Sequence, residues 1–372
     1  MNDTHTCGMD KPPIHFEAPT PRQLGYRMPA EWEEHAATWL TWPRPEGISF
    51  PGAFQEASAI WARITGVLCE NEQVHINVFD AEHRELVMRE LDRAGLSGKI
   101  QRSIFLHPFP AYEPWVRDHG PVFLKNESST CEASLAVVDW NYNAWGGKYP
   151  PYHLDDEVPK HVSNLLELPL FQPGIVMEGG SLDVNGCGDL LTTRSCLLNP
   201  NRNPSLSEQD IETYLREFLG VERIHWLGDG IEGDDTDGHV DDLSRFVAED
   251  VIVTVIEDDP SDKNYTPLME NYERLLHLRG ARGPFRIVTL PMPPRIERDG
   301  MRLPASYANF YIANSVVIVP VFKAPSDREA LVTLAELFPG RKIYALDATD
   351  LIWGLGAVHC ITQQQPAVKK SR

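Results

Sequence analysis

The residues best suited to chemistry gather in the run from Gly228 to Asp242, GDGIEGDDTDGHVDD, which holds six aspartates, one glutamate and one histidine. This run leads into the apolar segment 251–256, which predicts a strand. If the chain is already extended at His239 and Asp241, their side chains share one face, about 7 Å apart at the backbone. We therefore expect an imidazole and a carboxylate to meet, where the carboxylate can tune a titrating histidine. The alternative for the neighbouring acids is a solvated turn.

Three other segments carry unusual residues at the predicted starts of strands or near the chain end. Asp118 lies in WVRDHGP, Glu178 lies in MEGGS, and Cys360 follows glycines in GLGAVHC. A thiol that attacks an electrophile needs a base nearby, and carboxylates are the usual partners of a guanidinium. With His239, these residues form a set suited to attack on a planar cation. Taken singly, each could instead be a capping acid, an ion pair or an inert thiol.

A pattern of strand, turn, strand and helix positions these segments. A split fifth unit is expected from Ala36–Trp42 together with the segment that begins at His359. A ring of such units would bring distant segments to one central mouth, whereas ordinary alternating α/β architecture is the competing interpretation. The four continuous units are predicted over residues 118–166, 178–219, 239–278 and 307–337.

The bulk composition limits the partners. With a net charge of −20 and a pI near 5.0, the chain would repel nucleic-acid phosphates and anionic membranes, so we expect a small cationic partner, no nucleic acid and no membrane. No apolar run is long enough to cross a bilayer or to direct export, which predicts a cytoplasmic protein. Six cysteines without CxxC spacing predict neither a zinc site nor disulfides, and no cofactor motif is present. A homo-oligomer is left open.

Seven segments resemble, in order and spacing, the agmatine deiminases of the guanidino-group-modifying (pentein) superfamily, the bacterial-type peptidyl-arginine deiminase family. The resemblance runs from Tyr26 to Pro366 and implies an α/β fold, a five-unit α/β propeller with pseudo-fivefold symmetry around one site. We therefore expect a flexible arm at residues 1–25, one catalytic domain at 26–366 and a tail at 367–372. The segments are WVRDHGP, DWNYNAWGGKY, MEGGS, LLTTRSCLLNPNRNP, DGIEGDDTDGHVDD, YANFYIAN and VHCITQQQP.

The resemblance also implies roles for five residues. Cys360 would attack the guanidinium carbon. His239 would protonate the departing ammonia and then activate the water that hydrolyses a Cys-linked thiouronium intermediate. Asp118 and Asp241 would hold the guanidinium nitrogens and Glu178 would orient His239, with the assignment among the three carboxylates open to permutation. No metal and no cofactor are expected.

Four further residues are expected at the substrate. Trp115, three residues before Asp118, would form a wall for the aliphatic part, although it could equally be a core tryptophan. Gly179 and Gly356 would let a ligand approach the backbone closely. Asp235 would suit an ammonium group.

The implied reaction is hydrolysis of agmatine to N-carbamoylputrescine and ammonia, a step of polyamine biosynthesis that yields a putrescine precursor. The acids Glu232, Asp234 and Asp235 suit the second cation of agmatine, whereas Arg117 and Lys148 would favour the head group of arginine if they point inward.

The exact guanidine stays open between agmatine and free or peptidyl arginine. Leu355 and Ala357 stand where the family commonly has a glycine and an asparagine. Two hypotheses from other classes are a polyamine- or guanidine-binding protein without turnover, and metal-dependent hydrolysis through His239, Asp241 and Asp118. The first is disfavoured because binding requires no nucleophile, and the second because metal sites usually recruit more histidines.

Overall fold

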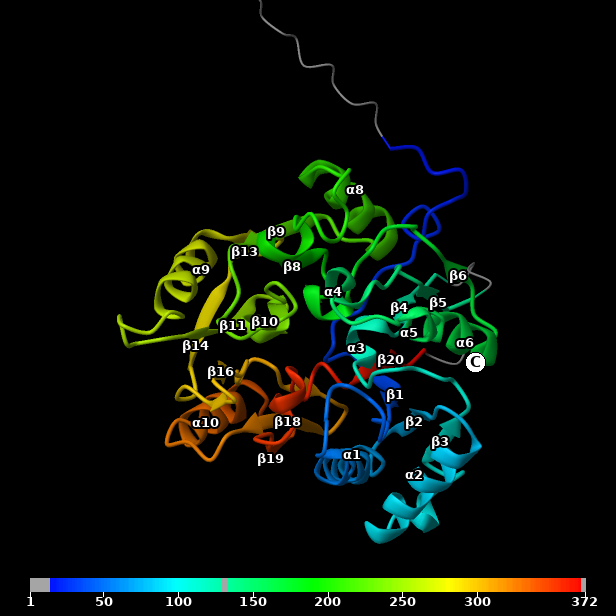
Figure 1. Ribbon diagram of the computed structural model, residues 1–372. Helices are drawn as coiled ribbons and strands as arrows, with labels where there is room; N and C mark the ends of the chain where they lie inside the picture. The colour runs from blue at the N-terminus through cyan, green and yellow to red at the C-terminus, as the bar shows by residue number, and fades with distance from the viewer. Residues whose placement is uncertain (1–13, 129–132, 369–372) are drawn as a thin grey trace, which may run out of the picture.

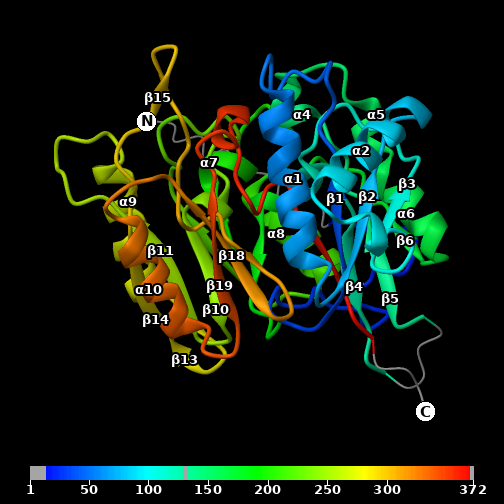
Figure 2. The ribbon, with the colours of Figure 1, turned by 90° about the horizontal axis from the view of Figure 1, so that it is seen from below.

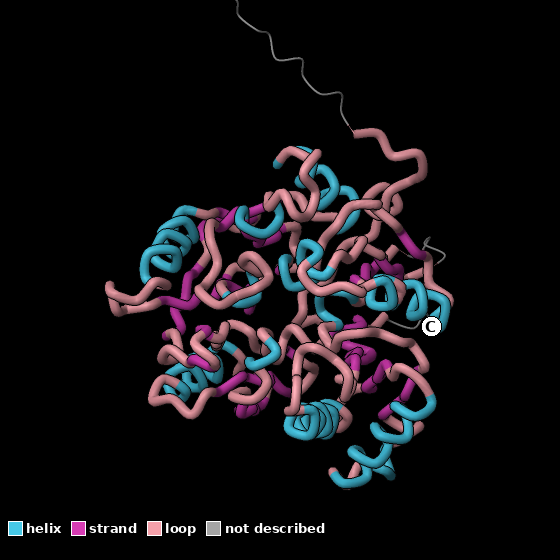
Figure 3. The backbone as a smooth tube through the Cα atoms, viewed as in Figure 1, coloured by secondary structure: helices cyan, strands magenta, loops and turns pink. Residues whose placement is uncertain are grey.

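The computed structural model describes residues 14–128 and 133–368. Their strands form five sheets of three or four strands and two short hairpins, so the predicted α/β class is confirmed. Figure 1 shows the five sheets around the middle of the molecule with the longer helices on the outside, and Figure 3 shows the same separation of strands from helices. Figure 2 shows the molecule from below, with most strands running roughly vertically. In Figure 1 these strands therefore point roughly along the line of sight.

The five sheets share one pairing pattern, in which an antiparallel pair is extended by a parallel strand. The first sheet joins both ends of the chain, because β20 (Gln363–Pro366) pairs antiparallel with β1 (His35–Thr41). The predicted pairing of these two ends is confirmed. The other strands of the five sheets are β2 (Gln73–Asn77) and β3 (Ile104–His107); β4 (Val122–Lys125), β5 (Leu135–Val138) and β6 (Leu170–Phe171); β7 (Asp183–Val184), β8 (Asp189–Thr193) and β9 (Arg223–Leu227); β10 (Ser244–Ala248), β11 (Val251–Ile256) and β14 (Arg286–Pro291); and β17 (Tyr311–Ile312), β18 (Val316–Val321) and β19 (Lys342–Asp347).

A helix precedes each parallel strand and covers its sheet. In α1 (Phe54–Leu68), the residues Ile60, Trp61, Ile64 and Leu68 recur at helical spacing and are buried. Burying such a side chain contributes about 1.5–3 kcal/mol, which holds the helix on the sheet. The other connecting helices are α2 (Ala81–Arg93), α5 (His153–Asp156), α6 (Val158–Leu166), α7 (Arg194–Leu197), α8 (Glu208–Leu219), α9 (Tyr265–His277) and α10 (Asp327–Leu337). The remaining elements are α4 (Ala144–Gly147), η1 (Ser97–Lys99), and the hairpins β12 (Arg279–Gly280) with β13 (Gly283–Pro284) and β15 (Glu297–Arg298) with β16 (Met301–Arg302).

Four short helical turns carry or adjoin the residues singled out above. They are α3 (Val116–His119), η2 (Gly179–Ser181), η3 (Val240–Asp242) and η4 (Ile352–Gly354). The expectation that strands begin at Asp118, Glu178 and His239 was wrong, because β4, β7 and β10 begin a few residues later. The reason is local at His239, whose backbone N–H donates to the side chain of Asp234, so a side-chain bond replaces a strand ladder there.

Part of the predicted N-terminal arm is packed against the domain. The ring of Phe16 meets Tyr214 and Phe218 of α8 edge-on, and Thr20 donates a 2.6 Å hydrogen bond to Glu217. Residues 1–13 of the arm and 369–372 of the tail lie outside the described residues. Within the described ranges, no helix combines the length and the apolar character needed to span a membrane.

Candidate active site

Three of the short turns converge on Gly180. The backbone N–H of this glycine donates a 2.9 Å hydrogen bond to Asp118 Oδ1. A Cβ atom added at this position would lie 2.5 Å from His239 Nδ1, 2.7 Å from Asp118 Oδ1 and 3.2 Å from Asp241 Oδ2. The missing side chain therefore allows an imidazole and two carboxylates to gather at one point, although Asp241 lies in η3 and not in the expected strand.

Cys360 lies beside this cluster, at the end of the segment that follows η4. Its Sγ is 3.9 Å from Asp241 Oδ2 and accepts a 3.3 Å hydrogen bond from Asn309 Nδ2. Burial raises the pKa of the thiol well above its usual value, and Asp241 and the neighbouring Asp242 raise it further. A thiolate is therefore disfavoured in the empty site, and a cation bound between the carboxylates would remove much of that penalty.

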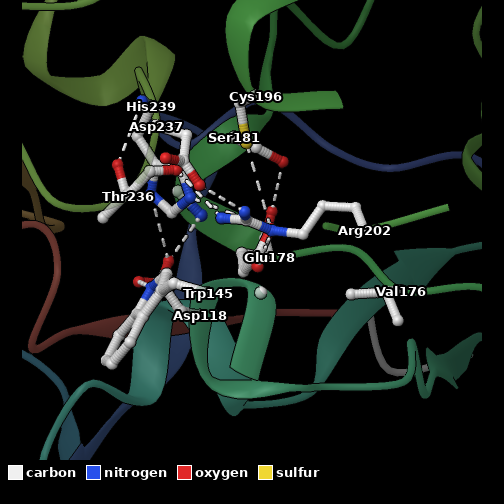
Figure 4. Close-up of polar contacts among 12 residues, drawn as sticks. Asp118, Trp145, Val176, Glu178, Ser181, Cys196, Arg202, Thr236, Asp237 and His239 are labelled. Carbon is white, nitrogen blue, oxygen red and sulfur yellow. Dashed lines mark hydrogen bonds and ion pairs between the residues drawn. The ribbon is translucent and has the colours of Figure 1, made fainter. Parts of the chain in front are cut away.

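His239 is fully buried between acids. Its Nδ1 lies 3.6 Å from Asp118 Oδ1 and its Nε2 lies 3.9 Å from Glu178 Oε2. Burial alone would lower its pKa, but Asp118, Cys196 and Glu178 outweigh burial and raise it well above the usual value. The ring is therefore set to be an imidazolium, which can donate a proton. Figure 4 shows the ring between the two carboxylates.

Glu178 is tied to an arginine that sequence reasoning missed. Arg202 Nε donates a 2.6 Å hydrogen bond to Glu178 Oε1, and its NH1 donates a 2.6 Å bond to Asp237 Oδ2 (Figure 4). The side chains of Arg202 and Glu178 are both fully buried. Burial raises the pKa of Glu178, but the nearby His239 and the hydrogen-bonded Arg202 lower it more strongly. Glu178 is thus an ionised carboxylate held in a fixed position behind His239.

Asp118 is held by Trp145 as well as by Gly180. The Trp145 indole donates a 2.9 Å hydrogen bond to Asp118 Oδ2. Burial, offset in part by His239, raises the pKa of Asp118 to about 6. This carboxyl is thus an acid that titrates close to neutral pH.

This raised pKa predicts an acid limb in the rate profile. Below about pH 6 the carboxyl of Asp118 is protonated and cannot hold a cation, so kcat/KM should fall about tenfold per pH unit as pH decreases. Bound guanidinium would keep Asp118 ionised, so the limb of kcat itself should lie at lower pH. Rates measured from about pH 5 to 8 check this; a flat kcat/KM down to about pH 5 would contradict the assignment.

A cavity of about 110 Å³ opens beside Cys360 and Asp118. Its acidic lining residues are Glu113, Asp118 and Asp235, and no lysine or arginine of residues 14–128 and 133–368 lines it. Three tryptophans supply flat apolar surface. The other lining residues are Ile48, Ser49, Trp115, Trp145, Tyr149, Thr236, Trp353, Gly354, Leu355 and Gly356, together with Cys360. The cavity suits a slender guest with an apolar stem and positive charge.

Of the three acids upstream of His239, only Asp235 reaches this cavity. Its carboxylate accepts the hydroxyl of Tyr149 and lies 3.5 Å from Lys148 Nζ. Asp234 is used by backbone donors of its own loop, and Glu232 pairs with Arg302 and two other cations away from the cavity.

The two cations that could have favoured a carboxylate head group do not line the cavity. Arg117 points to Gln364 and Glu31, and Lys148 pairs with Asp235 and Asp237.

The expected substrate neighbours Trp115, Gly179 and Gly356 have different surroundings. Trp115 lines the cavity and its indole donates a 2.9 Å bond to Ser49. A Cβ at Gly356 would lie 2.6 Å from the Trp115 ring, so this glycine makes room for the tryptophan. A Cβ at Gly179 would lie 2.1 Å from the carbonyl oxygen of Arg117, and this residue is not among those lining the cavity. Gly180, and not Gly179, faces the acids.

Several residues of the site were missed although most lie in the quoted segments. The segment DWNYNAWGGKY contains Trp145, LLTTRSCLLNPNRNP contains Cys196 and Arg202, and YANFYIAN contains Asn309. His359 directly precedes Cys360 in VHCITQQQP. Their presence in those motifs was the available signal. Glu31, which contacts His359, lies outside those segments and carries no such signal.

In the described part of the chain, one cluster of three side chains could ligate a metal ion. Ligand atoms of Glu178, Cys196 and His239 lie within 4.8 Å of one another. These are not the three residues considered from the sequence, and Glu178 already forms an ion pair with Arg202. The competing ion pair makes this group a poor fit for a metal ion.

Comparison with known proteins fits this geometry. The sequence pattern of the Porphyromonas-type peptidyl-arginine deiminases matches residues 27–366. An agmatine deiminase of Pseudomonas fluorescens is 37% identical over 379 residues, covering 94% of this chain and 98% of that protein. The solved agmatine deiminase of Enterococcus faecalis has a TM-score of 0.85 and 31% identity, covering 94% of this chain and 98% of that one. A substrate-bound agmatine deiminase of C. Jejuni has a TM-score of 0.82 and 27% identity, covering 95% and 98%. The chain therefore belongs to the Porphyromonas-type peptidyl-arginine deiminase family, together with these agmatine deiminases.

Proposed function

We propose that this protein is an agmatine deiminase, a hydrolase that converts agmatine and water to N-carbamoylputrescine and ammonia. The observation that carries the proposal is the placement of the Cys360 thiol beside Asp118 and Asp241, at an acidic cavity that no lysine or arginine lines in the part of the chain that the structure describes. A thiol is not needed for binding alone, so this arrangement favours turnover over a binding protein.

The first half of the proposed reaction forms a covalent bond to Cys360. Asp118 and Asp241 hold the guanidinium nitrogens, and the bound positive charge offsets the field of these acids on the thiol. The Cys360 thiol then loses its proton to solvent, and the resulting thiolate attacks the guanidinium carbon. His239, as an imidazolium, gives its proton to the departing nitrogen, which leaves as ammonia and leaves a thiouronium on the sulfur.

The second half returns the enzyme to its starting state. His239, now neutral, takes a proton from a water molecule that attacks the thiouronium carbon. The C–S bond then breaks and the new hydroxyl gives its proton to the departing sulfur, which releases the neutral carbamoyl product and restores the Cys360 thiol and the His239 imidazolium. Glu178, fixed by Arg202, stabilises the imidazolium each time it forms. In this reaction Glu178 stays behind the ring of His239, and Asp118 and Asp241 hold the substrate.

The acids of the cavity support agmatine as the substrate. Asp235 and Glu113 line it in addition to Asp118, so negative charge is present beyond the guanidinium end. Arginine would bring a carboxylate into this acidic space, where neither Arg117 nor Lys148 lines the wall. Like charges in a partly buried space repel, so discrimination against arginine is expected.

Parallel assays test the proposal. Purified protein should release ammonia and N-carbamoylputrescine from agmatine, with kcat/KM at least about 100-fold above that for arginine or for a peptide ending in arginine. Faster turnover of either arginine substrate would identify a different deiminase. Stabilisation by agmatine in a thermal shift assay without any ammonia would identify a binding protein.

We also propose an overall architecture and a cellular location for this protein. The five sheets around one site support a five-unit propeller with pseudo-fivefold symmetry, formed by one catalytic domain over residues 26–366. A cytoplasmic location is in keeping with Cys69, Cys187, Cys196 and Cys360, which are all free thiols.

A further inference from the structure

Behind the proposed catalytic residues lies a buried ionic cluster centred on His359 and Glu31. The His359 ring is 1% exposed and sits between two carboxylates. Its Nδ1 is 2.7 Å from Asp241 Oδ2, and its Nε2 is 2.7 Å from Glu31 Oε2. A neutral imidazole has one N–H and can donate to only one of them. Both contacts are satisfied together when the ring carries two protons or when one carboxyl is protonated.

The surroundings of Glu31 favour the doubly protonated ring. Glu31 Oε2 also lies 2.9 Å from a guanidinium nitrogen of Arg245 and 3.5 Å from one of Arg117. Its Oε1 accepts a 2.8 Å hydrogen bond from the backbone N–H of Ile312. Burial raises the pKa of Glu31, but Arg245, His359 and Arg117 together lower it well below its usual value. With Glu31 ionised, Nε2 of the ring must be the donor.

Asp241 gains a fixed cation from this arrangement. Burial raises its pKa, but the hydrogen bond and the charge of His359 lower it more. Its Oδ2 is occupied by His359, whereas Oδ1 is buried and has no hydrogen-bond partner in the described part of the chain. Oδ2 is also the oxygen that lies 3.9 Å from Cys360 Sγ. The cation also lies close to the thiol of the adjacent Cys360, where it opposes the field of the aspartates.

The cluster also connects segments that are distant in sequence. Glu31 precedes β1, Arg117 adjoins Asp118 in α3, and His359 adjoins Cys360. Arg245 lies in β10 and also pairs with Asp183 of β7. The charged groups that face the ring are thus Asp241, Glu31, Arg117 and Arg245. Glu31 contacts the side chains of Arg117 and His359, which are the sequence neighbours of the proposed catalytic residues Asp118 and Cys360.

We infer that His359 and Glu31 are positioning residues, an imidazolium–carboxylate pair that keeps Asp241 ionised and holds its Oδ2 beside the Cys360 thiol. His359 acts on the substrate only through Asp241, and Glu31 acts only through His359. The effect on turnover rests on the proposed function, whereas the protonation of the ring does not. Neither His359 nor Glu31 is among the residues to which the proposed reaction assigns a role.

Ring ¹⁵N spectra of histidine-labelled wild-type protein test the first part, with the His359 signal assigned by its loss in His359→Gln. Because both ring nitrogens lie 2.7 Å from a carboxylate oxygen, the doubly protonated pattern is expected at neutral pH. A single-tautomer, neutral pattern at neutral pH would overturn it. This measurement needs neither a folded Glu31 variant nor turnover, so it can succeed even if agmatine is not the substrate.

The second part is tested with Glu31→Gln, which keeps the shape and removes the charge. Agmatine kcat/KM should fall at least about tenfold, and its acid limb should steepen from one proton to two, because Asp241 now titrates with Asp118. Glu72→Gln is the matched control, since Glu72 is equally buried, pairs with His35 and accepts a backbone bond from Asn314. A purely structural role would lower stability in both variants and leave both limbs unchanged, and that result would overturn the inference.

Discussion

Replacing Cys360 by serine is expected to lower kcat for agmatine by at least about 10³-fold while agmatine still binds. A serine hydroxyl is far harder to ionise than a thiol, and the acids Asp241 and Asp242 that already raise the pKa of Cys360 would oppose an alkoxide even more. The carboxylates that hold the cation are unchanged, so binding should persist. Ammonia release measures the first effect and calorimetric titration with agmatine the second.

Cys69→Ser provides the control for this substitution. Cys69 is another buried free thiol, at the end of α1 and away from the cavity. Its replacement should leave kcat within about threefold of the parent, with a small loss of stability. If the Cys360 variant kept more than a tenth of the parent rate, another nucleophile would have to do the work.

Adding one methyl group at Gly180 is expected to lower kcat/KM for agmatine by at least about 100-fold. The new Cβ would lie 2.5 Å from His239 Nδ1 and 2.7 Å from Asp118 Oδ1, closer than van der Waals contact allows. The imidazole and the carboxylate would have to move apart, and a displacement of about 1 Å is enough for such a loss. Steady-state kinetics on Gly180→Ala, with circular dichroism to verify folding, checks this.

Gly98→Ala is the matched substitution outside the site. A Cβ at Gly98 would meet no atom within 4 Å, so this variant should keep the parent kcat/KM and stability. An active Gly180→Ala enzyme would show that the two side chains do not need their close approach.

The sequence was sufficient to single out the five residues proposed for the reaction, but not the residues that hold them or their local geometry. Cys360, His239 and Asp118 stand in long motifs, and their convergence follows once distant segments are joined by the paired chain ends β1 and β20. The strand expected at His239 was wrong because Asp234 binds the backbone of its own loop. Such side-chain bonds to the backbone leave no periodic trace in the sequence.

Glu31 could not have been singled out in advance. It lies in PAEWEEH with Glu33 and Glu34, and nothing in that segment distinguishes the three glutamates. Glu33 pairs with Arg27 at the surface, whereas Glu31 reaches Arg245, more than two hundred residues away in the chain. Which glutamate turns inward is decided by the cations of the folded core, so only the tertiary structure reveals it.

The central claim is that the sulfur of Cys360 bonds to the guanidinium carbon. Acid-quenching the wild-type protein during agmatine turnover, followed by digestion and mass spectrometry, tests it most directly. The peptide that contains Cys360 is expected to gain the mass of agmatine minus ammonia, and this gain should be absent in Cys360→Ser. Steady turnover with no adduct at any quench time, or an adduct on a different cysteine, would contradict it.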